Sequence, residues 1–428
     1  FKESASSRDN PKRDWYVWRD PKHDGSEPNN WVGVFTGPAW SLDEATGQFY
    51  RHSFLPHQPD LNWRNPEVRE AMYSVARFWL DLGVDGFRVD AAHQIMKDPL
   101  ERDNPPVPEG HERPWKDMGE FDDFLHLYDF AHADTHQVHR EFAAVLAEYP
   151  GEKLSVGEIH IFDMPEWAEF YGEQLDEFSM PFNFHLFAAH WDATSTRAAI
   201  ESVLWHIPDG TFTNWTLGNH DETRMATRLG QENARMAAVM ILTLPGSAYI
   251  YYGDELGMEE NSVGPDGSLD PWGQNMGDRS RDGSRAPMMW DRSDDAGFGS
   301  REPWLPLSVG HKTMNVEAQL DEDGSMLNLY RSILRYRSSS SALRSGDYQT
   351  HPLSDDEVLL YQRATDEESL LVALNFSDGI KSLGLAAGRV VVSTHAIEHR
   401  SFGSEGLVLE PREAVVIEPL ETGRLLAD

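Results

Sequence analysis

Three acidic residues each follow a short apolar run: Asp90 in DGFRVD, Glu158 in VGEIH and Asp221 in LGNHDETR. Each run is typical of a buried strand, and the intervals between them are long enough for one or more helices. That order is typical of an α/β barrel, whose chemistry gathers at the carboxyl ends of its strands. Three acids on one rim, with Arg88 and His220 beside them, would supply what glycosidic bond cleavage needs. These needs are a nucleophile, a proton donor and charge to hold a cationic transition state.

Arg88 precedes Asp90 by two residues, so on a strand both side chains point to the same face. A fixed cation there would keep Asp90 ionised and nucleophilic at neutral pH. Glu158 must instead begin protonated, which requires a less polar setting or the nearby negative charge of Asp90. A single acid after a strand is usually a helix cap or a loop residue. Three in order, each behind an apolar run, favour two acids of opposed protonation and a retaining mechanism through a covalent intermediate.

Further segments resemble those of a known family. QPDLN at 58–62, YYGDELGM at 251–258 and RDGSRAPMMW at 281–290 are similar to segments of glycoside hydrolase family 13, the α-amylase superfamily. Within it the chain resembles the α-glucosidase and oligo-1,6-glucosidase group, from residue 1 to about 304 and more weakly beyond. The resemblance implies a (β/α)8 TIM-barrel catalytic domain, with an inserted loop domain and a C-terminal all-β domain.

The resemblance also implies roles for the motif residues. Asp90 would be the nucleophile, Glu158 the acid/base and Asp221 the transition-state stabiliser. Arg88 and His220 would contact the nucleophile and the glucose hydroxyls.

Four other residues are candidate substrate contacts. The resemblance implies that Arg281 or Arg285 closes the pocket at the non-reducing end, without indicating which one. Phe54 could stack on a sugar face or pack in the interior. In the family the residue after the nucleophile correlates with linkage, with valine accompanying α-1,6 preference. Here that residue is Ala91, which favours α-1,4 linkages as in maltose.

The expected function is therefore a retaining α-glucosidase that releases α-glucose from the non-reducing end of short α-glucosides, with transglucosylation as a further outcome. Two alternatives stay open: an oligo-1,6-glucosidase, and a disaccharide isomerase of the trehalose synthase or sucrose isomerase type. The three motif acids disfavour a non-catalytic sugar-binding protein.

The composition of the chain restricts the classes of molecule that it can bind. The chain has 428 residues, of which 39% are hydrophobic and 11% aromatic, so it can bury a large core in two or three domains. A net charge of −35 disfavours nucleic acid and anionic membranes as partners and leaves a small neutral α-glucoside. There is no cysteine, and no apolar run approaches the roughly 20 residues of a membrane span. We expect a bacterial cytoplasmic protein, although the chain begins at Phe1 and its native N-terminus is not visible.

The predicted domains are an irregular loop domain at 1–62, a barrel portion with the acids at 63–340, and a C-terminal β-sandwich at 341–428. Five barrel strands are predicted, at 83–90, 153–160, 176–184, 212–221 and 247–258. Since a barrel of this type needs eight strands, we expect that its first three are missing from this chain and that an N-terminal fragment completes it. No cofactor is expected, and a structural calcium or magnesium ion would bind in that missing part.

Helix signals lie between the strands. Asn65 as N-cap, Pro66 at the first helical position and Gly83 as terminator predict a helix over about 66–82. Further helices are predicted within 121–149, at 232–244 and at 325–339, and a long loop at 260–306. The spacing of His132, His136 and His139 on a helix is compatible with zinc ligation. A solvated helix face is the favoured interpretation, so no metal site is predicted.

Overall fold

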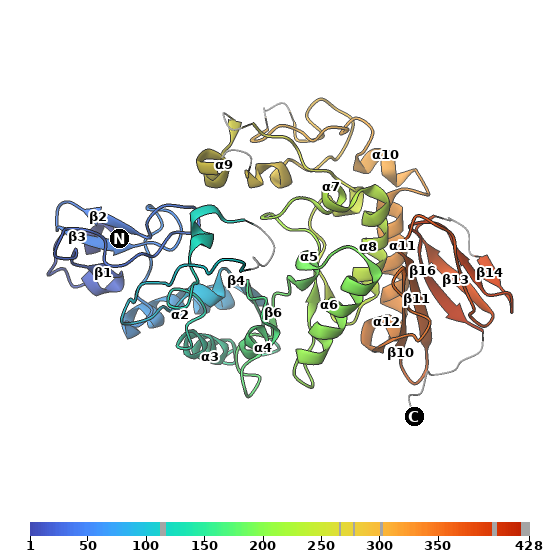
Figure 1. Ribbon diagram of the computed structural model, residues 1–428, viewed down its shortest axis with the longest axis horizontal. Helices are drawn as coiled ribbons and strands as arrows, with labels where there is room; N and C mark the ends of the chain where they lie inside the picture. Colours follow the sequence, from blue (N-terminus) through green and yellow to red (C-terminus); the bar gives the residue numbers. More distant parts are fainter. Residues whose placement is uncertain (112–116, 265–266, 277–278, 300–302, 396–399, 421–428) are drawn as a thin grey trace. The chain divides into compact units, whose positions relative to one another are not determined.

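The computed structural model describes residues 1–111, 117–264, 267–276, 279–299, 303–395 and 400–420 (Figure 1). Two compact units make up the chain. Unit 1 comprises Phe1–Phe182 and Pro208–Thr211, and unit 2 comprises Asn183–Ile207 and Phe212–Asp428. The predicted boundaries at residues 62 and 340 stay predictions.

The first part of unit 1 contains a small sheet where the sequence predicts an irregular loop. Its strands are β1 (Trp18–Arg19), β2 (Trp40–Asp43) and β3 (Gln48–Arg51), in the antiparallel order β1-β3-β2. Strands of two to four residues are too short to show a period of two in the sequence. A local core made of Val17, Trp31, Ala39, Trp40 and Phe49 covers this sheet.

A parallel sheet of three strands carries the first two motif acids of unit 1. Its order is β4 (Gly86–Val89), β5 (Leu154–Gly157) and β6 (Met180–Pro181). A Cβ atom on Gly86 would lie 2.1 Å from the carbonyl oxygen of Leu154, so only glycine allows the close approach of β4 to β5. These strands lie at the positions predicted from the sequence.

Helices pack beside this sheet. In α2 (Pro66–Asp81), the Asn65 side chain accepts a hydrogen bond from the Glu67 amide, which confirms the predicted N-cap. In α3 (Thr135–Leu146), Val138 and Val145 join Tyr73 and Leu80 of α2 in one hydrophobic core. The helix predicted within 121–149 therefore begins only at Thr135. The other helices of unit 1 are α1 (Lys2–Ala5), η1 (Arg13–Trp15), η2 (Ala92–Gln94), η3 (Gly119–Asp123), α4 (Met164–Ala168) and η4 (Glu169–Tyr171).

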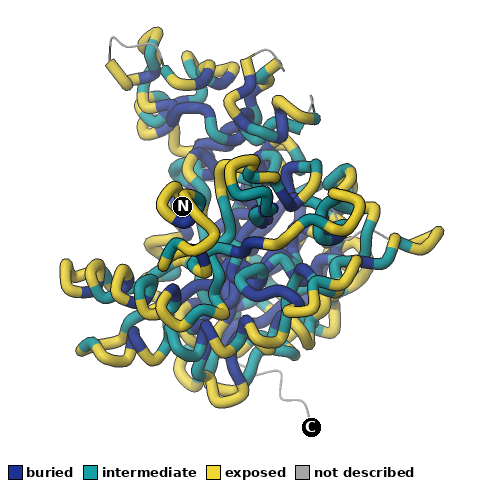
Figure 2. The backbone as a smooth tube through the Cα atoms, turned by 90° about the vertical axis from the view of Figure 1, so that its left-hand side faces the viewer, coloured by how far each residue is buried: buried dark blue, intermediate teal, exposed yellow. Residues whose placement is uncertain are grey.

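Unit 2 contains the other two predicted barrel strands as a parallel pair, β7 (Asn214–Trp215) and β8 (Ser247–Ala248). Of the two helices between them, α8 (Gln231–Thr243) is buried from Met236 to its end, and buried residues are dark blue in Figure 2. A strand, a buried helix and a parallel strand form the repeating unit of an α/β fold. The five predicted strands are thus all present, although each is shorter than predicted, and β6, β7 and β8 have only two residues each.

The last part of unit 2 is all-β, as predicted, and is drawn in the red end of Figure 1. A six-stranded antiparallel sheet has the order β14-β13-β16-β11-β10-β9, and a second sheet pairs β12 with β15. Side chains of both sheets, among them Leu360, Leu383 and Leu409, share one hydrophobic core. The strands are β9 (Asp347–Thr350), β10 (Val358–Ala364), β11 (Ser369–Asn375), β12 (Lys381–Leu383), β13 (Gly388–Ser393), β14 (Arg400–Phe402), β15 (Leu407–Leu409) and β16 (Ala414–Pro419).

Among its described residues, the segment predicted as a long loop at 260–306 contains the helices α9 (Pro271–Met276) and η7 (Arg281–Arg285). Both are shorter than two turns and show no full apolar period, so hydrophobic patterning could not reveal them. The remaining helices of unit 2 are α5 (His185–Ala188), α6 (Ala193–His206), α7 (Met225–Leu229), η5 (Asp254–Leu256), α10 (Val316–Leu320), α11 (Met326–Ser339) and α12 (Ser341–Ser345). Within the described ranges, no helix combines the length and apolar character that crossing a membrane requires.

Candidate active site

Asp90 and Glu158 lie side by side at the carboxyl end of the sheet in unit 1. Each follows the last residue of its strand, and those last residues, Val89 and Gly157, are partners in the parallel register. The Glu158 amide donates to the Val89 carbonyl over 2.8 Å, and the Ala92 amide donates to the Glu158 carbonyl over 3.1 Å. The backbone therefore fixes the spacing of the two acids. The Asp90 side chain is 79% exposed, whereas that of Glu158 is 9% exposed.

Arg88 joins the two carboxylates. Its Nη1 lies 3.0 Å from Asp90 Oδ1, and its Nη2 contacts Glu158 Oε2. The predicted contact with Asp90 is thus present, and the contact with Glu158 was not predicted. From the sequence, we expect Glu158 to be kept protonated by a less polar setting or by the nearby negative charge of Asp90. The structure instead gives Glu158 a cationic neighbour, because the strand register brings Arg88 to both acids.

Two histidines that sequence reasoning missed surround Glu158. His160 Nε2 lies 2.8 Å from Glu158 Oε1, and His93 Nδ1 donates to the Glu158 carbonyl over 3.2 Å. Burial, reinforced by the nearby His160 and Lys97, holds the pKa of His93 well below its ordinary value. His93 is therefore a neutral packing and hydrogen-bonding group. The i, i+2 spacing that predicted the Arg88 contact also relates His160 to Glu158, and it could have identified this contact.

Ala91 turns the chain directly after Asp90. Its φ and ψ angles are 41° and 42°, in the left-handed region that favours glycine. The turn starts η2 and directs the Ala92 amide to the carbonyl of Glu158. The small side chain at this position is thus coupled to an unusual backbone, which the sequence does not reveal.

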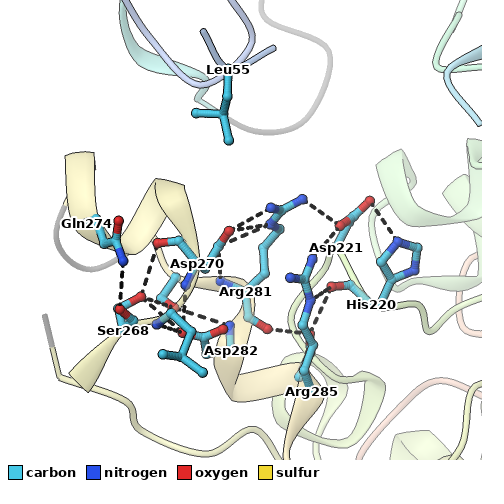
Figure 3. Close-up of polar contacts among 12 residues, drawn as sticks. Leu55, His220, Asp221, Ser268, Asp270, Gln274, Arg281, Asp282 and Arg285 are labelled. Carbon is cyan, nitrogen blue, oxygen red and sulfur yellow. Dashed lines mark hydrogen bonds and ion pairs between the residues drawn. The ribbon is translucent and has the colours of Figure 1, made fainter. Parts of the chain in front are cut away.

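Asp221 is the centre of a second cluster, in unit 2 (Figure 3). Its Oδ1 accepts hydrogen bonds from Arg281 Nη1 over 2.8 Å and from Arg285 Nη2 over 3.0 Å. His220 Nε2 lies 3.4 Å from Asp221 Oδ2. The structure therefore brings together four predicted site residues here, and it places both candidate arginines on Asp221.

The two arginines of η7 are held differently. Asp270 accepts hydrogen bonds from Nε and Nη2 of Arg281, the latter over 2.6 Å. Burial would lower the pKa of the Arg281 guanidinium, but its bonds to Asp270 and the charge of Asp221 hold that pKa above its usual value. Arg285 instead donates through Nε to the carbonyl of His220 over 2.9 Å.

A buried acid lies close to the turn that leads to Asp221. A Cβ atom on Gly218 would lie 2.4 Å from Asp254 Oδ2, so a larger residue would collide with that carboxyl group. Burial raises the pKa of Asp254 to about 7 despite the nearby Arg224. Arg224 is itself buried, donates to the Tyr252 carbonyl over 2.8 Å and packs over the ring of Tyr251.

The remaining predicted residues have other contacts. Phe54 packs against the Phe35 ring, with a centroid separation of 6.0 Å, and its role as a sugar contact stays a prediction. The solvated-face interpretation is wrong for His139, which is buried and donates through Nε2 to the Ala92 carbonyl over 3.0 Å. His136 lies 2.8 Å from Glu177. Neither contact could be read from helical spacing, because both partners are distant in sequence.

Comparison with known sequences relates the chain to one family. A profile of the alpha amylase catalytic domain matches residues 1–346. The chain is 36% identical over 393 residues to a probable alpha-glucosidase of Rhizobium meliloti strain 1021, covering 88% of this chain and 70% of that protein. It is 32% identical over 423 residues to an oligo-1,6-glucosidase of Parageobacillus thermoglucosidasius, covering 88% and 72%.

Solved structures show the same fold. The alpha-glucosyl transfer enzyme XgtA superposes with a TM-score of 0.85 at 33% identity, covering 97% of this chain and 79% of that one. The trehalulose synthase MutB of Pseudomonas mesoacidophila MX-45 superposes with a TM-score of 0.84 at 28% identity, covering 98% and 80%.

Proposed function

The chain belongs to the α-amylase family and is a glycoside hydrolase, and on that premise we propose that it is a retaining α-glucosidase acting on short α-glucosides. The observation that carries the proposal is the placement of Arg88 between Asp90 and Glu158. A retaining glycosidase needs two carboxyl groups roughly 5 to 5.5 Å apart, one as nucleophile and one as acid/base. Two carboxylates on one guanidinium at adjacent strand ends are suited to that spacing.

Asp90 is the proposed nucleophile and Glu158 the proposed acid/base. The exposed carboxylate of Asp90 is open to a sugar carbon, and Arg88 supports its negative charge. Glu158 is nearly buried and lies against His160, so it is shielded from bulk water. Asp90 attacks the anomeric carbon while Glu158 protonates the leaving oxygen, and Glu158 then activates the water that releases glucose.

Asp221 is the proposed transition-state stabiliser. The two arginines on its Oδ1 maintain it as an anion, which can offset the positive charge that develops on the sugar ring. His220 is proposed to contact a glucose hydroxyl from its place beside Asp221.

Arg285 is the proposed glucose contact of the two arginines. Asp270 occupies the Nε and Nη2 groups of Arg281, which leaves that guanidinium little freedom to turn toward a ligand. Arg285 is held by one backbone carbonyl and by Asp221, so a sugar hydroxyl can replace one of its bonds at lower cost.

We propose a preference for α-1,4 linkages because Ala91 leaves room beside the nucleophile. One side chain's volume supplies only about 1 to 3 kcal/mol of discrimination. The likeness to a glucosyl transfer enzyme supports transfer to a second sugar as a side reaction.

The net charge of −35 supports the further proposal that neither nucleic acid nor an anionic membrane is a partner. We also propose a bacterial cytoplasmic setting, since a chain without cysteine has no disulfide that needs an oxidising compartment.

Product analysis of the purified protein tests this function. Maltose, isomaltose, sucrose and an aryl α-glucoside are each incubated with it and followed by proton NMR. We expect glucose from maltose, with the α-anomer formed first. If β-glucose is formed first, the mechanism is inverting. Accumulation of a rearranged disaccharide from sucrose or maltose, without net glucose, would establish the isomerase alternative that resembles the trehalulose synthase.

A further inference from the structure

Asp270 is almost wholly engaged by one other residue. Its side chain is 0% exposed. Its Oδ1 accepts from Arg281 Nη2 over 2.6 Å, and its Oδ2 accepts from the Arg281 backbone amide over 2.7 Å. Arg281 Nε lies 3.1 Å from both oxygens. Burial would raise the pKa of Asp270, but these bonds to Arg281 outweigh it and hold the pKa below its ordinary value.

The segment around Asp270 is built to hold this carboxylate still. Asp282 Oδ2 accepts from the backbone amides of Leu269 and Asp270, over 2.7 Å and 3.0 Å, and from Ser268 Oγ over 3.0 Å. Gln274 Nε2 donates to the Ser268 carbonyl over 3.1 Å, and Figure 3 shows this cluster around η7. Asp282 therefore holds the backbone of Asp270 in place, and Asp270 in turn holds the side chain of Arg281.

The guanidinium of Arg281 is also held from its face and from its far end. Its central carbon lies 4.9 Å from the ring centroid of Trp272, a cation–π distance. Asp270 accepts hydrogen bonds from the edge formed by Nε and Nη2, and Nη1 donates to Asp221. A carboxylate that takes two donors of one guanidinium fixes the plane of that group as well as its position.

We propose that Asp270 is a positioning residue, which clamps Arg281 so that its Nη1 holds Asp221 in one orientation. This role of Asp270 rests on the proposed function of Asp221 as transition-state stabiliser. The family resemblance implies no role for Asp270. Arg281 would be a permanent partner of Asp221, whereas Arg285, which lacks such a clamp among the described contacts, exchanges its bonds with the sugar.

The test compares Asp270→Asn with a surface control. Asparagine has nearly the same shape, but its amide NH₂ would face the donors of Arg281, so one side of the clamp is lost. The control is Asp294→Asn. It removes the same charge from a side chain that is fully exposed. We expect kcat/KM on maltose to fall about 10- to 100-fold in Asp270→Asn, mainly through kcat, and to be unchanged in the control.

A double-mutant cycle separates positioning from general damage. If Asp270 acts through Arg281, then Asp270→Asn should have little further effect in an Arg281→Met background, and its full effect in an Arg285→Met background. Equal effects in both backgrounds, or wild-type kcat/KM in Asp270→Asn, would overturn the inference.

A crystal structure of Asp270→Asn tests the positioning of Arg281 without an activity measurement. Arg281 Nη1 should leave hydrogen-bonding distance of Asp221 Oδ1, while Arg285 stays. An unchanged Arg281–Asp221 contact refutes the proposal whatever the substrate proves to be. Absence of hydrolysis by the wild-type protein would instead refute the proposed function, and the two failures are thus distinct.

Discussion

The two clusters of predicted site residues differ in their ratio of cations to carboxylates. In unit 1 one guanidinium, that of Arg88, lies between two carboxylates. In unit 2 two guanidinium groups bind the single carboxylate of Asp221. With these groups ionised, the two carboxylates of the first cluster share one cation, whereas the carboxylate of Asp221 has two cationic neighbours, one of which, Arg281, also binds Asp270.

This difference matches the chemistry proposed for each cluster. Where two carboxylates share one cation, a proton added to one of them relieves repulsion, which suits a pair in which one group stays ionised and the other exchanges a proton. A carboxylate with two cations resists protonation and serves as a constant negative charge.

The clusters also differ in how they are built. Strand register and backbone hydrogen bonds position Asp90 and Glu158. Side-chain hydrogen bonds within a loop and a short helix position the arginines around Asp221. Substitutions of Asp90 and Glu158 should therefore affect chemistry directly, and substitution of Arg281 should act through the geometry of Asp221.

The largest expected effect comes from the nucleophile. Asp90→Asn should lower kcat/KM on maltose by at least about 10³-fold, because no covalent intermediate can form. Circular dichroism should show an unchanged fold, since the side chain is exposed. Asp85→Asn, at the start of the same segment and 97% exposed, is the matched control. Near-wild-type turnover by Asp90→Asn would remove it from the mechanism.

The proton donor should show a substrate-dependent effect. Glu158→Gln is expected to slow maltose cleavage by about 10²-fold or more, but to slow the first step on an aryl glucoside with a good leaving group far less, because that group needs little protonation. Pre-steady-state bursts on both substrates give the comparison. Equal losses on the two would mean that Glu158 is not the acid.

The arginines test the charge comparison itself. Arg88→Lys should lower kcat/KM roughly tenfold more than Arg285→Lys, because lysine lacks the rigid fork of donors with which Arg88 spans two carboxylates, whereas Asp221 would keep Arg281 as a second partner. The measurement is kcat/KM of both variants on the same aryl glucoside. A larger loss in Arg285→Lys would show that substrate contact outweighs the sharing of charge.

A smaller effect is expected at Ala91. Ala91→Val should shift preference toward isomaltose by about tenfold, the amount a pocket methyl or two contributes. Because the backbone is left-handed, valine should also lower the free energy of unfolding by about 1 to 3 kcal/mol. Ala91→Gly relieves the backbone without adding volume, so it should keep the wild-type linkage preference. If glycine also shifts preference, backbone geometry and not volume sets the linkage.

The last prediction concerns stability and not turnover. The folded-state pKa of Asp254 is about 7, above its ordinary value of 3.8, so folding favours the protonated form. This group's stabilisation is complete below about pH 4 and is lost as pH rises through 7, by roughly 1 to 4 kcal/mol. Asp254→Asn should flatten the dependence of urea unfolding on pH between these limits. Asp294→Asn, which is fully exposed, should retain the wild-type slope.

The sequence by itself determined the strands that precede the three acids, the longer helices and the acids themselves. Apolar runs placed β4, β5 and β7 ahead of Asp90, Glu158 and Asp221, and local capping signals placed the start of α2 at Pro66. These features depend on side-chain period and on contacts within a few residues, which the order of amino acids encodes directly. The i, i+2 spacing was also sufficient for the contact of Arg88 with Asp90.

Only the tertiary structure decided which partners those acids have. The contact of Arg88 with Glu158 requires the register between β4 and β5, which is set by packing over the whole sheet. The clamp of Asp270 on Arg281 joins residues in a segment without hydrophobic period, where no local rule selects one carboxylate among several. The left-handed turn at Ala91 is likewise fixed by its surroundings, because alanine has no intrinsic preference for that conformation.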